Sequence, residues 1–204
     1  MNKKYLKADL INDLKIIIEL AQSGEISYAA VKALIDKYSW FLTEEGYDEK
    51  SDTLVDAKYK GCKYWSEEAI NKYKETDPKI EKREFRHEHV VPRILFKDYL
   101  MRIIDQNEKI SFEDLESIIS RNLIACVVTK DEDKYKLSNY SKTMPGDEAN
   151  SSFEEIRDAW ARYRETSIKV FEVEWNRSGR WNLVESKELD FDEYKNETIK
   201  NIGE

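Results

Sequence analysis

The chain has few of the residues that mark several protein classes. Its two cysteines, Cys62 and Cys126, are far apart and form no CxxC pair, which excludes a zinc knuckle with four thiolates. Six glycines and three prolines are too few for a disordered chain or a β-sandwich. No apolar run approaches membrane-spanning length, and residues 1–5 carry no apolar leader segment. We therefore expect a helix-rich cytoplasmic protein with no membrane partner.

The chain also has fewer basic residues than acidic ones. The formal net charge is −8, and Lys and Arg still number 34. This balance argues against a uniformly basic surface for nucleic acid, although it permits a local basic groove. Residues 185–204 are markedly acidic and would suit a basic protein partner. Five Trp, twelve Tyr and seven Phe supply much of the apolar area that a core needs.

Hydrophobic periodicity and capping residues predict an α+β fold. The predicted helices are 6–22, 27–38, 66–75, 92–104, 111–120, 130–137 and 153–165. The predicted strands are 84–91, 123–128, 168–173 and 180–185. We expect the first two helices to form an antiparallel hairpin, and the continuous apolar run of 123–128 to be a buried strand.

What the chain does contain is a concentrated group of titratable residues. Its only two histidines, His87 and His89, flank Glu88 at the end of a predicted strand. Histidine suits general-base chemistry near neutral pH, and a carboxylate suits a hard metal ion. A second strand and a helix that begins with carboxylates follow later in the chain. A strand–strand–helix unit of this kind would suit phosphodiester hydrolysis, with a histidine base and one divalent ion.

The segment Glu88-His89-Val90-Val91-Pro92 resembles the first motif of HNH (ββα-metal) endonucleases, D/E-H-[IV]-[VI]-P. Residues 64–69, 126–132, 144–145 and 160–163 resemble one HNH-like subgroup, so the similarity covers roughly residues 62–170. The resemblance implies a mostly helical shell around a ββα-metal core. We expect an N-terminal helical hairpin at 1–50, an HNH-like nuclease domain at 54–175, and a C-terminal strand with an acidic tail at 176–204.

The resemblance also implies roles for individual residues. Glu88 would bind the metal ion, His89 would be the general base, and Asn122 would orient that base. The family usually has a histidine or asparagine as its last metal ligand, whereas Asp133 aligns there in this chain, with Asp131 as the next choice. Aspartate suits Mg²⁺ or Mn²⁺ better than Zn²⁺. Acidic residues in a first helical turn also oppose the helix dipole without binding a metal.

Three basic residues are candidates for contact with nucleic acid. The guanidinium groups of Arg86 and Arg93 match phosphate geometry, although ion pairs within an acidic protein explain them equally well. Lys63 lies in a basic and aromatic stretch just before the motif. Arg162, beside Trp160 and Tyr163, would clamp a nucleic acid or, as we favour, belong to a helix that packs on the sheet.

Three functions remain open. The resemblance favours a metal-dependent endonuclease that cleaves DNA in preference to RNA, in a setting such as phage defence or restriction. The missing ligand histidine and the net charge favour a catalytically inactive HNH-like domain that serves as a protein-interaction subunit. A third interpretation is a zinc-stabilised binding module, in which His87 and His89 share one strand face and Glu88 points away.

Overall fold

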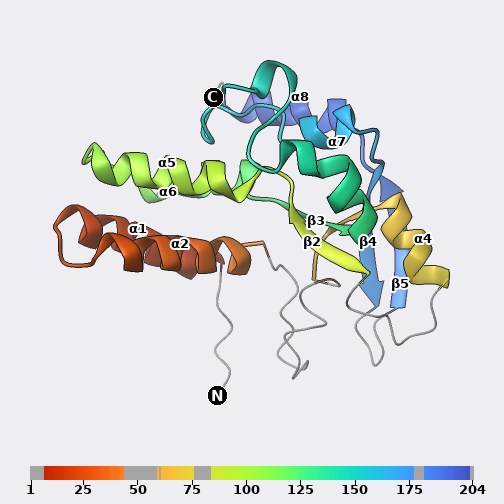
Figure 1. Cartoon of the computed structure of the whole chain (residues 1–204), viewed down its shortest axis with the longest axis horizontal. Coiled ribbons are helices and arrows are strands. Elements are labelled where there is room, and N and C mark those ends of the chain that lie inside the picture. The colour runs from red at the N-terminus through yellow and green to blue at the C-terminus, as the bar shows by residue number, and fades with distance from the viewer. Residues whose placement is uncertain (1–6, 44–58, 60, 76–83, 177–181, 203–204) are drawn as a thin grey trace.

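The computed structural model describes residues 7–43, 59, 61–75, 84–176 and 182–202 (Figure 1). Helices α1 (Lys7–Gln22) and α2 (Tyr28–Phe41) form the predicted hairpin. Ser27 caps α2, because its hydroxyl accepts a hydrogen bond from the Ala30 amide at 3.3 Å. Gly24 follows α1 with a φ of 76°, a conformation that glycine adopts without strain. None of the described helices is long and apolar enough to cross a membrane.

Five strands form one mixed sheet, which confirms the predicted α+β class. The strands are β1 (Tyr64–Ser66), β2 (Phe85–His89), β3 (Ala125–Thr129), β4 (Val170–Asn176) and β5 (Asn182–Glu188). Their order in the sheet is β2-β3-β1-β4-β5, with β1 parallel to β3 and the other pairs antiparallel. Strand β2, which carries the histidines, therefore lies at one edge of the sheet. Strand β1 was not predicted, because three residues are too few to show an alternating pattern.

Strand β3 is buried on both faces, as its continuous apolar run predicts. All five of its residues are buried. Cys126 and Val128 belong to the larger apolar cluster, whereas Ala125 and Val127 belong to a smaller cluster on the opposite face. The sheet thus separates two cores.

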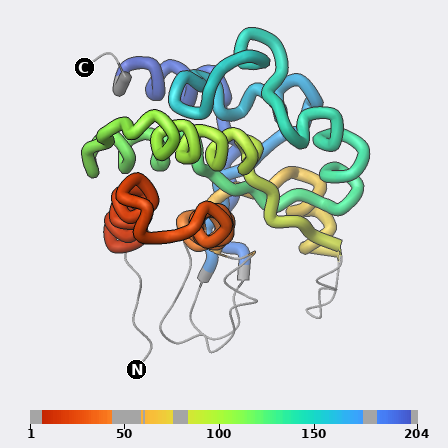
Figure 2. Tube along the Cα trace, turned by 60° about the vertical axis from the view of Figure 1, so that its left-hand side comes forward, coloured from red at the N-terminus to blue at the C-terminus, as the bar shows by residue number. Residues whose placement is uncertain are grey.

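Three helices lie between the first three strands along the chain. Helix α4 (Glu67–Glu75) follows β1, and Ser66 caps it by accepting the Ala69 amide at 3.1 Å. Helices α5 (Arg93–Asp105) and α6 (Phe112–Asn122) are inserted between β2 and β3. Both lie against the N-terminal hairpin, so the hairpin and this insertion share one apolar core (Figure 2).

Three segments differ from the prediction. Most of the expected helix at 130–137 is a π-helix, η1 (Glu132–Leu137), and two 3₁₀ turns follow it, η2 (Ser138–Tyr140) and η3 (Gly146–Glu148). The expected helix at 153–165 is correct only for α7 (Ala161–Glu165). The acidic tail continues past its strand as helix α8 (Phe191–Ile202).

Local contacts explain the last two differences. The Asp158 carboxylate accepts a hydrogen bond from the Trp160 amide at 3.2 Å, a turn that delays the start of α7. Asp190 caps α8 by accepting the amides of Asp192 and Glu193 at 2.9 and 3.0 Å. Phe191 then stacks on Trp160 with ring centroids 5.6 Å apart, which gives the acidic helix an apolar anchor.

Candidate active site

A cavity of about 720 Å³ lies at the edge strand β2. Five of the residues proposed from the sequence line it together: Arg86, Glu88, His89, Arg93 and Asp133. They come from β2, from the start of α5 and from η1. The strand–strand–helix order therefore brings the motif and a carboxylate of the following helix into one pocket.

The side chains of β2 alternate across the sheet. His87 pairs with Val127 and His89 pairs with Ala125, so both histidines lie on the face of the smaller core. Glu88 lies opposite Cys126 and points to the other face. The cavity is lined by side chains from both faces of β2, because β2 is an edge strand. Among the described residues, β2 pairs only with β3.

The two histidines share a wall made by Trp40 of α2. The indole lies 5.0 Å from the His87 ring and 4.8 Å from the His89 ring, centroid to centroid. Nε2 of His89 lies 3.2 Å from the Ser39 carbonyl and 3.4 Å from the Thr43 hydroxyl. The carbonyl can only accept, so we assign the proton to Nε2, which leaves the lone pair on Nδ1.

Burial lowers the pKa of His89 to about 3, and the neighbouring His87, Arg93 and Arg162 lower it further, against the Ser39 hydrogen bond. The imidazole is therefore neutral throughout the physiological range, and this is the form that accepts a proton.

This pKa has a consequence for stability that a His89→Gln variant tests. The unfolded chain takes up a proton near pH 6.5, whereas folded His89 stays neutral down to about pH 3. Acid therefore favours the unfolded state. We expect the free energy of unfolding of the wild type to fall by about 1.4 kcal/mol per pH unit more than that of His89→Gln, between roughly pH 6 and 4. Urea unfolding over this range measures the difference, and parallel profiles would contradict the burial argument.

Glu88 is held by a buried arginine. Arg162 of α7 is 1% exposed, and its Nη2 lies 3.0 Å from Oε1 of Glu88, which is 16% exposed. Nη1 reaches Oε2 at 3.5 Å. Burial raises the pKa of the Glu88 carboxyl, and the guanidinium of Arg162 offsets part of that rise. Arg162 also donates to the carbonyls of His89 at 2.9 Å, Val90 at 3.2 Å and Leu137 at 3.4 Å. It thus fixes the motif to η1.

The π-helix η1 begins with Glu132 and Asp133, and Asp131 precedes it; these three acidic residues are placed differently. Asp133 lines the cavity, and its carboxylate lies 3.8 Å from Nε of Arg86. Asp131 is exposed and does not line the cavity. Glu132 is buried and accepts hydrogen bonds from the Ser66 hydroxyl at 2.7 Å and the Thr129 amide at 2.8 Å. Of the two aspartates proposed as the last ligand, the structure brings only Asp133 to Glu88.

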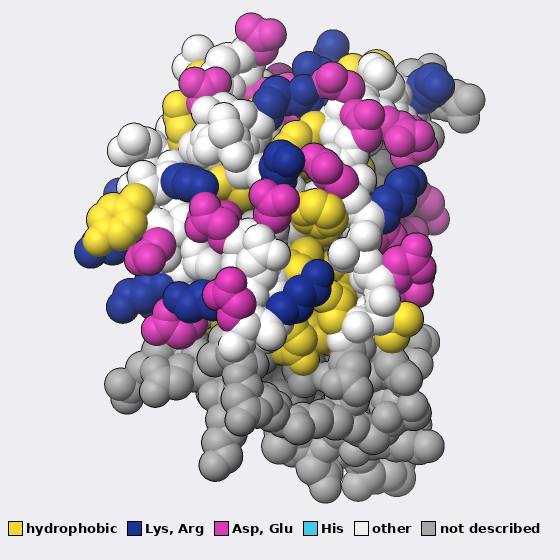
Figure 3. All heavy atoms as spheres, turned by 90° about the vertical axis from the view of Figure 1, so that its right-hand side faces the viewer, with side chains coloured by type: hydrophobic (Ala, Val, Ile, Leu, Met, Phe, Trp, Pro, Cys, Tyr) yellow, Lys and Arg dark blue, Asp and Glu magenta, His cyan; other side chains and the backbone are white. Residues whose placement is uncertain are grey.

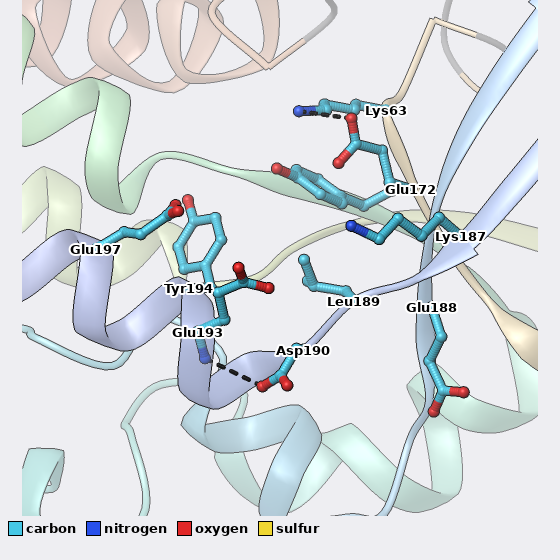
Figure 4. Close-up of a pocket in the computed structure, with 10 residues that line it drawn as sticks. Lys63, Glu172, Lys187, Glu188, Leu189, Asp190, Glu193, Tyr194 and Glu197 are labelled. Carbon is cyan, nitrogen blue, oxygen red and sulfur yellow. Dashed lines mark hydrogen bonds and ion pairs between the residues drawn. The ribbon is translucent and has the colours of Figure 1, made fainter.

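Two other proposed residues lie away from this cavity. Asn122 is buried at the end of α6, where its amide donates to the Phe153 carbonyl at 2.6 Å. Lys63 precedes β1 and forms an ion pair with Glu172 at 2.9 Å. Figure 4 shows this pair in a separate cavity, whose lining also includes Glu188, Asp190, Glu193 and Glu197. The structure brings neither residue to His89.

Sequence reasoning missed two residues of the site. Arg162 was interpreted as part of a packing helix, and its neighbours Trp160 and Tyr163 are indeed fully buried. The signal for its role was an arginine within the stretch that resembles the HNH-like subgroup. Trp40 carried no signal, because its place depends on how the hairpin packs against β2.

The surface offers no competing basic region on the face shown in Figure 3. Acidic and basic side chains are interspersed there, among the described residues that the view shows. Several basic residues of the described chain are also used in ion pairs with carboxylates.

Among the described residues, no group of three or more His, Cys, Asp and Glu side chains is arranged to hold a metal ion. No family model, curated protein or solved structure matches the chain. The chemistry of the cavity is therefore the basis for assigning a function.

Proposed function

We propose that this protein is a metal-dependent, HNH-like endonuclease that hydrolyses phosphodiester bonds of DNA. The observation that carries the proposal is the single cavity shared by Glu88, His89 and Asp133. Glu88 and His89 are adjacent on β2, whereas Asp133 comes from η1, and together they supply a base and two carboxylates. That is the set that the resemblance to HNH endonucleases implies.

The charges of the cavity support a phosphate substrate. Arg86, Arg93, Lys97 and Lys142 line it with the carboxylates Asp36, Glu88 and Asp133, so cations outnumber carboxylates in a chain whose formal net charge is −8. A local concentration of cations in an acidic protein favours an anionic ligand, and guanidinium groups match phosphate oxygens in geometry. The volume of about 720 Å³ also exceeds what one phosphate needs, since whole small ligands occupy pockets of about 300–1,000 Å³.

His89 would act as the general base through Nδ1. Its Nε2–H is directed to the Ser39 carbonyl, so Nδ1 keeps the lone pair that takes a proton from water. The water oxygen would attack phosphorus as the bond to the leaving oxygen breaks. The cationic Arg93 and Arg162 lower the pKa of His89, and a bound phosphate would offset those charges. Substrate binding would therefore make the imidazole a stronger base.

The carboxylates fit a magnesium-type ion. Burial is the main cause of the raised pKa of Glu88, and the charge of Asp133, which lines the same cavity, raises it further. Proteins commonly bind Mg²⁺ through one or two carboxylates, with water and substrate phosphate as the other ligands. Glu88 and Asp133 would hold the ion, which would stabilise negative charge on the phosphoryl and leaving oxygens. Arg162 would keep the Glu88 carboxylate in a fixed orientation.

The test is cleavage of plasmid and single-stranded DNA with Mg²⁺, Mn²⁺ or Zn²⁺, on wild type and two aspartate variants. We expect Asp133→Asn to raise the Mg²⁺ concentration needed for half-maximal activity by about 10- to 100-fold, because it removes a charged ligand. Asp131→Asn is the matched control, since Asp131 lies in the same segment outside the cavity, and its activity is expected to stay within about twofold of the wild type. No cleavage by the wild type with any of these ions would refute the proposal.

A second candidate is an inactive HNH-like domain that serves as a protein-interaction subunit. It is favoured by the guanidinium partners of both carboxylates, Arg162 at Glu88 and Arg86 at Asp133. The acidic cavity of Figure 4 would then offer Glu188, Asp190, Glu193 and Glu197 to a basic partner. Binding of such a partner without metal dependence, together with absent cleavage, would favour this candidate.

A further inference from the structure

We propose that Trp40, from the N-terminal hairpin, positions Arg93 as part of a phosphate subsite completed by Lys97 and Lys142, so that the cavity binds a nucleic-acid strand at more than one phosphate. This inference rests on the proposed function, because it names a second contact of the same substrate.

The first support is the stacking of Arg93. Its guanidinium carbon lies 4.6 Å from the centroid of the Trp40 ring. Stacking on an indole is an attraction between the cation and the ring face, and it leaves the N–H groups at the edge of the guanidinium plane available. Among the described residues, Arg93 has no carboxylate within ion-pair distance and no hydrogen-bond acceptor for its side chain. The ring holds the cation without neutralising it.

The second support is the remaining charge of the cavity. Glu88 is paired with Arg162, and Asp133 is paired with Arg86. The remaining carboxylate of the lining is Asp36, and the remaining cations are Arg93, Lys97 and Lys142. None of these three cations has an ion pair within the described part of the chain. Three cations against one carboxylate leave a local positive charge that a phosphate would offset.

The third support is the position of these cations. Arg93 and Lys97 are four residues apart on α5, so they lie on one face of that helix. Lys142 follows the η2 turn and lines the same cavity. Glu88 lies on the other face of β2 from the Trp40 ring, and Arg93, Lys97 and Lys142 line the cavity in addition to the carboxylates proposed to bind the metal. A cavity of about 720 Å³ with these additional cations suits more than one phosphate of a strand.

The hairpin also contacts the proposed base. The Ser39 carbonyl and the Trp40 ring both contact His89, and α2 supplies both groups. The N-terminal helices lie outside the stretch that resembles HNH endonucleases. In this protein they would nevertheless form one wall of the substrate site.

The experiment measures binding of a fluorescent single-stranded DNA oligonucleotide by anisotropy, in Mg²⁺-free buffer over a range of salt. We expect Trp40→Leu to weaken binding by on the order of tenfold, and Trp40→Phe to weaken it less, because phenylalanine keeps a ring for the cation. Arg93→Ala should also reduce the slope of log affinity against log salt by about 0.7, since one phosphate contact is lost.

The double variant separates positioning from a general structural effect. If Trp40 acts through Arg93, Trp40→Leu should have little further effect on affinity in the Arg93→Ala background. Phe41→Leu is the matched control, because Phe41 is the next residue of α2, contacts Lys37 through its ring, and does not line the cavity. Unchanged thermal melting of each variant would show that the fold is intact.

The outcomes distinguish this inference from the nuclease proposal. Equal losses from Trp40→Leu with and without Arg93, or no loss, would overturn the positioning role even if the wild type cleaves DNA. Binding that depends on Trp40 and Arg93 in a wild type that cleaves nothing would uphold the subsite and reject the nuclease. A mononucleotide that binds as tightly as the oligonucleotide would overturn the multi-phosphate site. Failure of the wild type to bind either would overturn the phosphate subsite, whereas the cleavage assay with metal ions decides the nuclease proposal.

Discussion

Replacing His89 with alanine is expected to reduce Mg²⁺-dependent cleavage of DNA by a factor of about 10²–10⁴, the usual contribution of a general base. The physical reason is the loss of Nδ1, the nitrogen that would accept the proton of the attacking water. Initial rates at saturating and at low substrate concentration measure the loss in kcat and in kcat/KM.

His87→Ala is the matched control for this measurement. His87 lies two residues away on the same strand face, is also buried, and contacts the same Trp40 ring. We expect its rate to stay within about tenfold of the wild type, because His87 lies two residue pairs from His89, further from the end of β2. Equal rates for His89→Ala and the wild type would remove His89 from the mechanism.

The pH profile provides an independent check on the base. The pKa of His89 is lowered to about 3 in the free protein, so its protonation cannot reduce kcat/KM near pH 6.5. A base with an ordinary histidine pKa would lose activity there as the pH falls. We therefore expect the wild-type profile to lack a descending limb attributable to histidine between pH 7 and 5.

Arg162→Met is expected to destabilise the fold by about 3–5 kcal/mol at pH 7, because it leaves the Glu88 carboxylate and three main-chain carbonyls without their buried donor. The side chain of Arg162 is 1% exposed, so water cannot replace it without rearrangement. Urea unfolding followed by circular dichroism gives the change in free energy.

A double variant distinguishes an unpaired charge from lost packing. Arg162→Met combined with Glu88→Leu should recover a large part of the stability, since two apolar side chains often replace a buried ion pair without loss. Arg164→Met is the control on the same helix. Arg164 is 39% exposed and pairs with Asp158 and Asp192, so its loss should cost about 1 kcal/mol. A change below about 1 kcal/mol for Arg162→Met would show that the buried pair does not stabilise the fold.

The helices and the buried strand were predictable because their causes are local. Apolar spacing specifies α1, α2, α5 and α6, and serines at positions 27 and 111 mark the starts of α2 and α6. The run 123–128 predicts β3 because a strand covered on both faces needs apolar residues throughout. The short strand β1 was missed because its pairing with β3 and β4 defines it, and no pattern within three residues shows that pairing.

The distinction between local patterns and long-range pairing also applies to the candidate site. Glu88 and His89 were predicted from one contiguous motif, and Asp133 from the order of elements after it. Lys63 was proposed because it precedes the motif closely in sequence, yet β3 lies between β1 and β2 in the sheet. Arg162 is 74 residues from Glu88 in the sequence. The burial of a charged residue depends on a partner that the fold brings to it, so the sequence around Arg162 does not predict it. Long-range pairing, which a single sequence does not display, decides such positions.

The hydrogen bonds of Arg162 bear on how this protein opens locally. One guanidinium joins the end of β2, the last turn of η1 and helix α7, through the carbonyls of His89, Val90 and Leu137. None of these segments can detach while the others keep the arginine in place without leaving a buried donor or acceptor unmet. They would exchange their amide hydrogens as one cooperative unit, whereas the outer turns of α8 would open separately. Local opening would then disrupt the geometry of the candidate site and expose this region to proteases in the same event.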